Sequence, residues 1–345
     1  MSVVAARTVE GTFRASRPGP RLPTQAGLRP DLTLLVCTHN RTRLLERSLR
    51  NLTEQRVGPS VRWEVLVVDN GSPDGTRDVV ANVGSEGRLS GLRYVFEPRL
   101  GVSHARRRGI LAARGELIAF VDDDCLPESN WIEEVLRFAA LHPEAGAFGG
   151  RNQILWETPP PWLAELYGES LGRQELGDQA LRMPVTAWRM PVGAGLVVRR
   201  EAVWASGWLE RGVLRGRHPR SLGCGEDTEI ALYIRHAGWD VWYAPALRLH
   251  HVIPRHRTTL AHLRGIHRGF GRAEVYLRAL ARGPDLGQRL EGMAWAFRQL
   301  QTVLARFPQG FVRFAKERPT WLIRLSYAWG CLEGAGYYLV TLRGW

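Results

Sequence analysis

The sequence predicts an α/β fold with a mostly parallel, doubly wound sheet flanked by helices, and two observations support this. First, short apolar runs rich in β-branched residues recur, each followed by a polar turn. The runs are Leu32–Cys37, Trp63–Val68, Leu92–Phe96 and Glu116–Val121. Second, helical segments separate several of these runs, and strands that alternate with helices form parallel sheets with right-handed crossovers.

The turns and helices follow in the order that this fold requires. The turns are Thr38–Arg41, Asp69–Gly75 and Arg99–Gly101, and helices extend to about Gln55, through Ala113 and over Asn130–Ala140. In such sheets ligands bind beyond the carboxyl ends of the strands. Thr38, Asp69 and the acidic residues after the fourth run are therefore candidate ligand contacts.

Three consecutive carboxylates, Asp122, Asp123 and Asp124, stand at the end of the fourth run. Their repulsion is unfavourable unless a divalent cation lies there. In an extended segment alternate side chains share a face, so we expect Asp122 and Asp124 to point together and Asp123 to point away. Two aligned oxygens suit Mg²⁺ or Mn²⁺ with open positions for phosphate oxygens. The alternative is a solvated loop in which Ser129 caps the next helix.

A second acidic element, Glu226-Asp227, follows the glycine-flanked segment 223–225 and begins a helix to about His236. The helix dipole stabilises a carboxylate at this position, so an ordinary cap is one explanation. Upstream, Gly193-Ala194-Gly195 would let the backbone approach a bound ligand closely, or would form a turn or bulge.

Four stretches in order resemble family 2 glycosyltransferases with the GT-A, Rossmann-like nucleotide-sugar-binding fold. They are VCTHNRTRLLERSL at 36–49, VLVVDNGSPDGT at 65–76, EPRLGVSHARRRGILAARGELIAFVDDDCLPESNW at 97–131 and GCGEDTEIALYIRHAGWDVWYAPALRLHH at 223–251. Together they cover most of residues 32–251. The resemblance implies a GT-A catalytic domain at 31–255 that transfers a sugar from a nucleotide-diphosphate sugar.

The resemblance also implies where the donor nucleotide binds. Thr38 and Arg41 would border the base. Asp69 would accept a hydrogen bond from the uracil or ribose of a UDP-like donor, UDP-sugars being the favoured class. For Asp69 an Asx turn before Gly71 is the alternative, and both can hold at once.

Arg106 would lie near the donor nucleotide, and Asp122 would face the ribose and the diphosphate. The family often has an asparagine after this arginine, where the present chain has Arg107. Because Arg106, Arg107 and Arg108 are consecutive, they cannot all face inward. A solvated helix face is the alternative for Arg106.

The metal site implied by the resemblance consists of Asp124 with Asp122 beside it and His251 as a third contact. Counting from Pro245, the family's ligand histidine matches His251 better than His250. Adjacent strand residues face opposite ways, so at least one of the two histidines packs at a strand end. A histidine beside carboxylates shifts the preference toward Mn²⁺ over Mg²⁺.

The reaction implied by the resemblance is a single displacement with inversion. Asp227 is the general base on the acceptor hydroxyl, Glu226 positions the acceptor, and the cation at Asp124 takes up charge on the departing diphosphate. The acceptor is a glycan, lipid-linked or other hydroxyl. The alternatives are a catalytically silent GT-A nucleotide- or glycan-binding scaffold and a nucleotidyltransferase-like enzyme. The combined metal and base elements disfavour the first, and the Glu-Asp element disfavours the second.

The last 94 residues of the 345 differ in charge from the rest. They contain 15 Lys or Arg against 5 Asp or Glu, which is +10 of the formal net charge of +13. Helices are expected near 258–282, 288–317 and 320–342, with aromatic residues among the arginines. Such basic helices fit an anionic membrane surface. Nucleic-acid motifs are absent, and helix packing or oligomerisation is the remaining alternative. The segment Trp321–Leu342 is long enough to span a bilayer, but Arg324 and Glu333 inside it favour interfacial burial or a helical hairpin over a transmembrane helix.

Composition indicates the compartment. Residues 1–30, with four prolines, are expected to form a disordered leader, and no signal peptide is visible. Residues 256–345 form the basic, aromatic-rich helical extension. The four cysteines lack paired spacing, which favours reduced thiols and a cytosolic catalytic face. We therefore expect a cytoplasmic protein, peripheral on the inner face of the cell membrane.

Overall fold

The computed structural model describes residues 30–341 except 90, 185–189, 220, 283–285 and 306–313. Residues 1–29, and with them nearly all of the expected leader, lie outside the described residues. The main sheet has the order β3-β2-β1-β4-β8-β6-β11-β5, with β7 paired to β11. The strands are β1 (Leu32–Thr38), β2 (Trp63–Asp69), β3 (Leu92–Phe96), β4 (Leu117–Phe120), β5 (Cys125–Pro127), β6 (Ala145–Trp156), β7 (Leu181–Arg182), β8 (Val197–Arg199) and β11 (Asp240–Ile253). A separate hairpin consists of β9 (Arg217–His218) and β10 (Ser221–Leu222).

Most of the sheet is parallel, as the sequence predicts. Parallel pairing joins β1 to β2, β2 to β3, β1 to β4 and β6 to β11. The short β8 is antiparallel to both β4 and β6, so β6 and β11 point the same way as the first four strands. β5 and β7 run antiparallel to β11. Strand direction therefore places the ends of β1, β2 and β4 at one edge.

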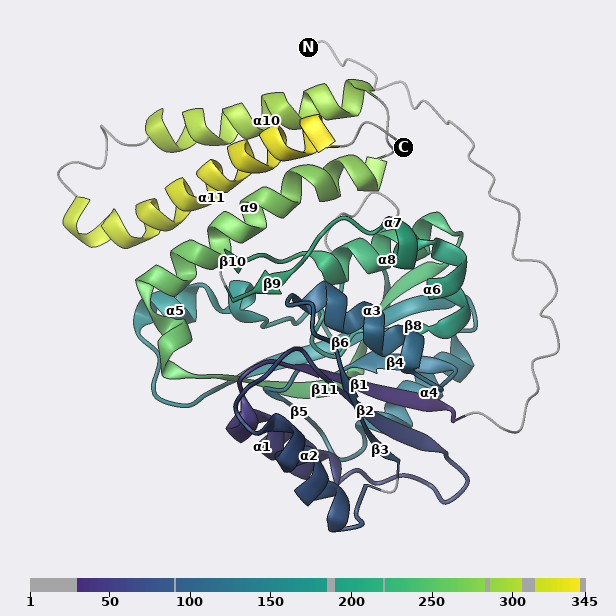
Figure 1. Cartoon of the computed structure of the whole chain (residues 1–345). Helices are drawn as coiled ribbons and strands as arrows, with labels where there is room; N and C mark the ends of the chain where they lie inside the picture. The colour runs from purple at the N-terminus through teal and green to yellow at the C-terminus, as the bar shows by residue number, and fades with distance from the viewer. Residues whose placement is uncertain are drawn as a thin grey trace.

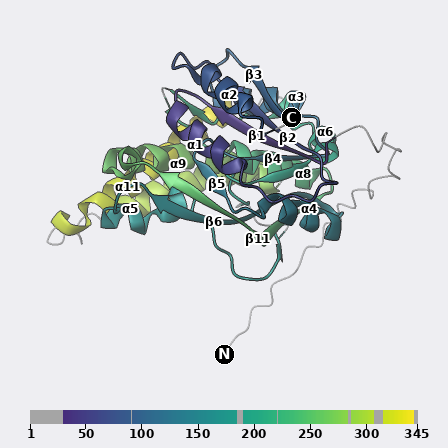
Figure 2. The same ribbon diagram turned by 90° about the horizontal axis from the view of Figure 1, so that it is seen from below.

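Helices cover both faces of this sheet (Figure 1). Strand side chains alternate between two cores, with Leu34 and Val36 in one and Leu35 in the other. The first core receives α1 (Thr42–Leu52), α2 (Thr76–Ser85) and α4 (Trp131–Leu141), the helices on the side viewed in Figure 2. The second receives α3 (Val102–Ala112), α6 (Arg200–Ser206), α7 (Trp208–Arg211) and α8 (Glu226–His236). Three short helices, α5 (Trp162–Leu166), η1 (Gly168–Leu171) and η2 (Arg255–Thr258), complete the part of the chain that precedes the long C-terminal helices.

Three long helices, stacked at the top of Figure 1, follow the sheet. They are α9 (Leu260–Arg282), α10 (Leu286–Ala305) and α11 (Phe314–Thr341). The extension is helical as expected, but the expected bounds of its last two helices are wrong. The third begins at Phe314 and passes Pro319 in its second turn, where the proline removes a hydrogen bond without ending the helix.

α9 packs with the sheet, because its residues Ala273, Tyr276, Leu277 and Leu280 lie in the second core. Glycines then hold α11 tightly on α9. A methyl group at Gly271 would overlap the backbone of α11, and one at Gly330 or Gly334 would overlap the backbone of α9. Glu333 of α11 pairs with two arginines of α9, and hydrogen bonding to Arg268 lowers the pKa of Glu333 to about 2.

Acid should destabilise this helical layer through His267 of α9. Its Nε2 lies 3.0 Å from Ser170 Oγ, and burial lowers the His267 pKa to about 4. In the unfolded chain a histidine has a pKa of ~6.5, so unfolding takes up a proton between pH 6.5 and 4. The free energy of unfolding therefore falls as the pH drops through this window, by up to ~3 kcal/mol from this group. His267→Gln should flatten part of the pH dependence of the urea midpoint, and an unchanged slope would contradict this assignment.

Candidate active site

A cavity of about 1370 Å³ opens at the edge where β1, β2 and β4 end. Thr38 closes β1, Asn70 follows β2, and Asp122 follows β4, and all three line the cavity. The sequence-predicted site residues that line it are Thr38, Arg41, Arg106, Asp122, Asp124, Glu226, Asp227 and His251. Asp69 is not among the lining residues. The sheet edge thus gathers nearly all of the predicted site in one space.

The acidic triad lies in a turn, and this overturns the expected alternation of its side chains. β4 ends at Phe120, and Asp123 and Asp124 form the turn before β5. Arg41 NH1 donates to both, at 2.8 Å to Asp123 Oδ1 and 3.0 Å to Asp124 Oδ2. Thr38 Oγ1 also donates to Asp123 Oδ2 at 2.7 Å. The expectation that Asp123 points away from Asp124 is therefore wrong, because the extended backbone stops before the triad.

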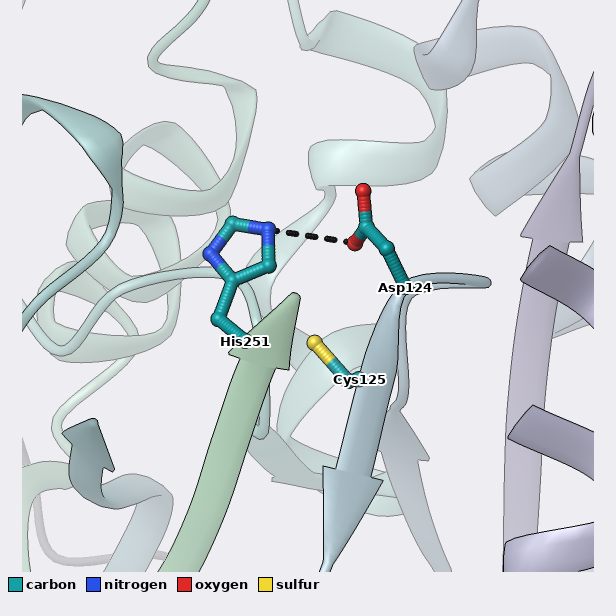
Figure 3. Close-up of side chains that lie close together, drawn as sticks. All are labelled: Asp124, Cys125 and His251. Atoms are coloured by element: carbon teal, nitrogen blue, oxygen red, sulfur yellow. Dashed lines mark ion pairs between the residues drawn. The ribbon is translucent and has the colours of Figure 1, made fainter. Parts of the chain in front are cut away.

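The side chains of Asp124 and His251 point toward each other (Figure 3). His251 Nε2 lies 3.1 Å from Asp124 Oδ1, and both side chains are buried. Burial raises the pKa of Asp124, but Arg257, His251 and Arg41 outweigh it and hold that pKa well below its usual range. The Cys125 thiol completes a close group of three possible ligands, although burial raises its pKa well above normal. His250, on the opposite side of the β11 strand, is not among the cavity-lining residues.

A buried arginine from the short helix η2 binds Oδ2 of Asp124. Arg257 of η2 is 2% exposed, and its NH1 lies 2.9 Å from Asp124 Oδ2. Its NH2 is buried without a hydrogen-bond partner in the described part of the chain. Arg41 and Arg257 thus share Oδ2, which leaves Oδ1 for the side that faces His251. Sequence reasoning missed Arg257 because Pro254-Arg255-His256-Arg257 resembles the start of the basic tail.

Replacing Arg257 should cost stability, because it leaves a buried carboxylate with one cation fewer. We expect Arg257→Met to lower the free energy of unfolding by ~3 kcal/mol, the usual result of removing one partner of a buried ion pair. Arg255→Met, two residues earlier and exposed, is the matched control and should change it by less than ~0.5 kcal/mol. Urea unfolding measures both. Similar values for the two variants would show that the Arg257–Asp124 pair has no net stabilising effect.

The Asp69 side chain binds the backbone of the turn that follows it, three residues on instead of the two of the Asx turn that the sequence offered as an alternative. Its Oδ1 accepts the Ser72 N–H at 2.9 Å, and its Oδ2 accepts the Tyr94 hydroxyl at 2.7 Å. Asn70, the next residue, bonds the Glu97 and Arg99 carbonyls and the Gly101 N–H. Asn70 therefore ties the β2 turn to the start of α3, while a nucleotide contact of Asp69 stays a prediction.

Arg106 connects the triad to the second acidic element. It is 3% exposed, with NH2 3.7 Å from Asp122 Oδ1, NH1 3.1 Å from Glu226 Oε1, and its guanidinium 5.0 Å from the centre of the Phe120 ring. Arg107 instead bonds a backbone carbonyl beside Trp208, and Arg108 is exposed. The three arginines thus diverge, and the alternative of a solvated Arg106 is wrong.

Glu226 and Asp227 begin α8 inside the cavity. Burial raises the pKa of Glu226 to about 7 against the opposing effect of Arg106, and its Oε2 is buried without a hydrogen-bond partner among the described residues. Asp227 Oδ2 accepts the Gly193 N–H at 2.6 Å, and Oδ1 accepts the Thr228 N–H at 2.8 Å. A side chain at Gly193 would lie 2.7 Å from Asp227 Oδ2, so this position needs glycine for the approach of its backbone to the carboxylate.

The family model described as glycosyl transferase family 2 matches residues 33–206, half of the chain. The matched segment contains Thr38, Asp69, Arg106 and the acidic triad. The chain belongs to glycosyl transferase family 2. This confirms the resemblance drawn from the sequence.

Two relatives of this family 2 chain illustrate how far the likeness extends. The succinoglycan biosynthesis protein ExoM of Rhizobium meliloti (strain 1021) is 28% identical over 251 residues, 71% of this chain and 74% of that protein. A validoxylamine A glucosyltransferase of Streptomyces hygroscopicus subsp. limoneus is 40% identical over 109 residues, 31% of this chain and 23% of that protein. This chain thus spans about a quarter of the second relative.

A solved structure confirms the GT-A fold of this family 2 glycosyltransferase. The mannosyltransferase PcManGT from Pyrobaculum calidifontis, in complex with GDP-Man and Mn²⁺, matches with a TM-score of 0.54 at 17% identity. The match covers 92% of this chain and 89% of that one. It therefore includes the C-terminal helices as well as the sheet.

Proposed function

We propose that this family 2 enzyme transfers a sugar with inversion from a nucleotide-diphosphate sugar to an acceptor hydroxyl, with Asp227 as general base and a divalent cation at Asp124. The observation that carries the proposal is the position of Arg106. It touches Glu226 on one side and approaches Asp122 on the other. The donor-side carboxylates and the acceptor-side base therefore share one cavity, as a single displacement requires.

The side-chain atoms of Asp124 and His251 that face each other are suitable ligands for a divalent cation. Both ring nitrogens of His251 are buried and lack a hydrogen-bond partner in the described structure, although Nε2 is 3.1 Å from Asp124 Oδ1. A carboxylate oxygen and an imidazole nitrogen suit Mn²⁺, and Mg²⁺ less well, whereas a thiol such as Cys125 suits neither. Asp122 is the further candidate ligand. When bound, the cation would supply positive charge to the donor diphosphate.

The residues on the acceptor side orient the attacking hydroxyl. The Gly193 and Thr228 N–H groups fix the Asp227 carboxylate, which retains lone pairs to accept the hydroxyl proton. Glu226 Oε2 is available for a second hydroxyl of the acceptor. Arg106 holds the other oxygen of Glu226 and adds positive charge beside the donor. No covalent sugar intermediate is needed.

The donor is proposed to be a UDP-sugar, whose nucleotide would lie near Thr38, Arg41 and Asp69. A donor screen tests this, with the full-length protein, Mn²⁺ or Mg²⁺, and UDP-, GDP- and dTDP-sugars. Nucleotide release and thermal shift are the readouts. Release from a GDP-sugar alone would contradict the UDP assignment, and release from none of the donors, with or without added glycan acceptors, would contradict the proposed activity.

The C-terminal helices are proposed to hold the enzyme on an anionic, cytoplasmic membrane surface, where a lipid-linked acceptor would be found. Among the described residues, no helix is both long and apolar enough to cross a membrane. Phe297 of α10 and Trp329 and Tyr337 of α11 are 57%, 52% and 48% exposed. Aromatic side chains beside arginines suit the boundary between lipid headgroups and chains.

Binding to vesicles should therefore depend on acidic lipid. Each Lys or Arg near such a surface contributes ~1 kcal/mol, so sedimentation with acidic vesicles should be strong and salt-sensitive. Trp329→Ser should weaken it, and Trp204→Ser, an exposed tryptophan of α6, is the matched control. Equal sedimentation of both variants, or no preference for acidic over neutral vesicles, would remove the membrane assignment and leave packing or oligomerisation for the tail.

A further inference from the structure

The active-site cavity extends beyond the catalytic residues along the C-terminal helices. One face of α9 lines it over three turns, through His267, Phe270, Ala273, Glu274 and Leu277. These positions recur every three or four residues and span ~15 Å of helix. Ile323, Arg324 and Tyr327 of α11 line the same space, as does Leu222 of β10. We call this part of the cavity the α9 groove.

The α9 groove begins beside the proposed base. A Cβ atom at Gly225 would lie 3.0 Å from Leu277 and 3.1 Å from Ala273, so α9 touches the residue that precedes Glu226. The Ala273 and Leu277 end of the groove therefore lies next to the start of α8, where Glu226 and Asp227 stand. The groove thus adjoins the acceptor side, because Glu226 and Asp227, the residues assigned to the acceptor, directly follow Gly225.

Most polar atoms of this wall are paired with a neighbour, and the exposed Arg324 lies beside Tyr167. Glu274 accepts the Tyr327 hydroxyl and the Arg278 Nε, and Arg278 lies over the Trp295 ring. His267 is paired with Ser170. What the groove offers a ligand is therefore mainly carbon, and apolar walls favour burial of hydrocarbon. Residues 169–175, several of them polar, line the same cavity and would face the sugar part.

We propose that the α9 groove binds the hydrocarbon chain of an amphipathic acceptor whose sugar end reaches Asp227. The proposal rests on the proposed function, since it takes Asp227 as the acceptor side. It assigns α9 and α11 a second role besides membrane contact. α11, which carries the exposed Trp329 and Tyr337, also forms part of the wall along which a lipid-borne acceptor enters.

Alkyl glycosides test the groove without turnover. Octyl and methyl β-glucoside, both below the concentration at which octyl glucoside forms micelles, are titrated into the full chain with UDP and Mn²⁺ and followed by saturation-transfer NMR. We expect octyl glucoside to bind at least tenfold more tightly. Tenfold is ~1.4 kcal/mol, which two buried methylenes supply. Equal affinity for the two glucosides would overturn the proposal.

Two variants locate the binding. Phe270→Ala and Leu222→Ala, on different elements of the groove, should each reduce the preference for octyl glucoside at least threefold, while Leu141→Ala, an exposed leucine of α4, should retain it. If one groove variant does not fold, as judged by its thermal melt, the other decides. Retention of the full preference by a folded groove variant would place the chain elsewhere and sink the proposal. The donor screen tests the proposed function separately, because it reads nucleotide release and not chain length.

Discussion

Asp227→Asn should abolish sugar transfer while donor binding survives. A general base contributes ~10²–10⁴-fold to the rate, and asparagine cannot take the proton of the acceptor hydroxyl. The substitution keeps the shape of the side chain and one oxygen for the Gly193 or Thr228 N–H, so the start of α8 should remain folded. Initial rates with the best donor of the screen measure the first effect, and nucleotide titration measures the second.

A matched control separates catalysis from helix capping. Asp78 is an exposed acid in the first turn of α2, so Asp78→Asn repeats the change at a helix start outside the cavity. We expect it to transfer sugar at the wild-type rate. A parallel loss of donor affinity and transfer in Asp227→Asn would recast Asp227 as a structural residue of the α8 cap.

Asp124→Asn should have the second large effect, on both the metal and the rate. It replaces the carboxylate with a neutral amide that has a single oxygen, so His251, Arg41 and Arg257 lose the negative charge that they share, while Arg41 keeps its pair with Asp123. Because a bound cation supplies several kcal/mol of charge stabilisation, we expect transfer to fall ~10²-fold or more. Electron paramagnetic resonance of Mn²⁺ should show weaker binding in the absence of donor, which reports the site independently of turnover.

Asp178→Asn is the control for this variant. Asp178 is exposed and pairs with Arg151, and not with the arginines that bind Asp124. It should leave Mn²⁺ binding and transfer unchanged. Transfer by the wild-type enzyme at its full rate in excess chelator, or unchanged Mn²⁺ binding by Asp124→Asn, would end the metal hypothesis.

The sheet was predictable because its strands are buried on both sides and read as apolar runs interrupted by turns. The edge at which Thr38 and the triad meet follows from strand direction alone. Side-chain direction within the triad did not follow, because it depends on where β4 stops, and the extended backbone ends at Phe120. If a strand ends one residue earlier or later than expected, the side chains that follow it point in other directions than strand alternation predicts.

Contacts between distant segments were the other limit. Arg257 meets Asp124 only after β11 has crossed the sheet beside β5, and nothing local distinguishes it from Arg255. Family resemblance selected His251 over His250, and the structure places His251 beside Asp124. For Asp69 the local turn could be predicted from Asp-Asn-Gly. Its hydrogen bond from Tyr94, which is distant in the sequence, could not.

The glycine contacts between α9 and α11 limit where this enzyme can be truncated or joined to a segment of a relative. α9 supplies core residues to the sheet on one side and meets the backbone of α11 on the other. A protein cut at residue 255 would lose Arg257 and expose the apolar surface that α9 covers. Exchange of the C-terminal region between relatives must therefore carry α9 and α11 as a matched pair, because a larger side chain at Gly271, Gly330 or Gly334 would separate them. Natural recombination and laboratory chimeras face the same restriction.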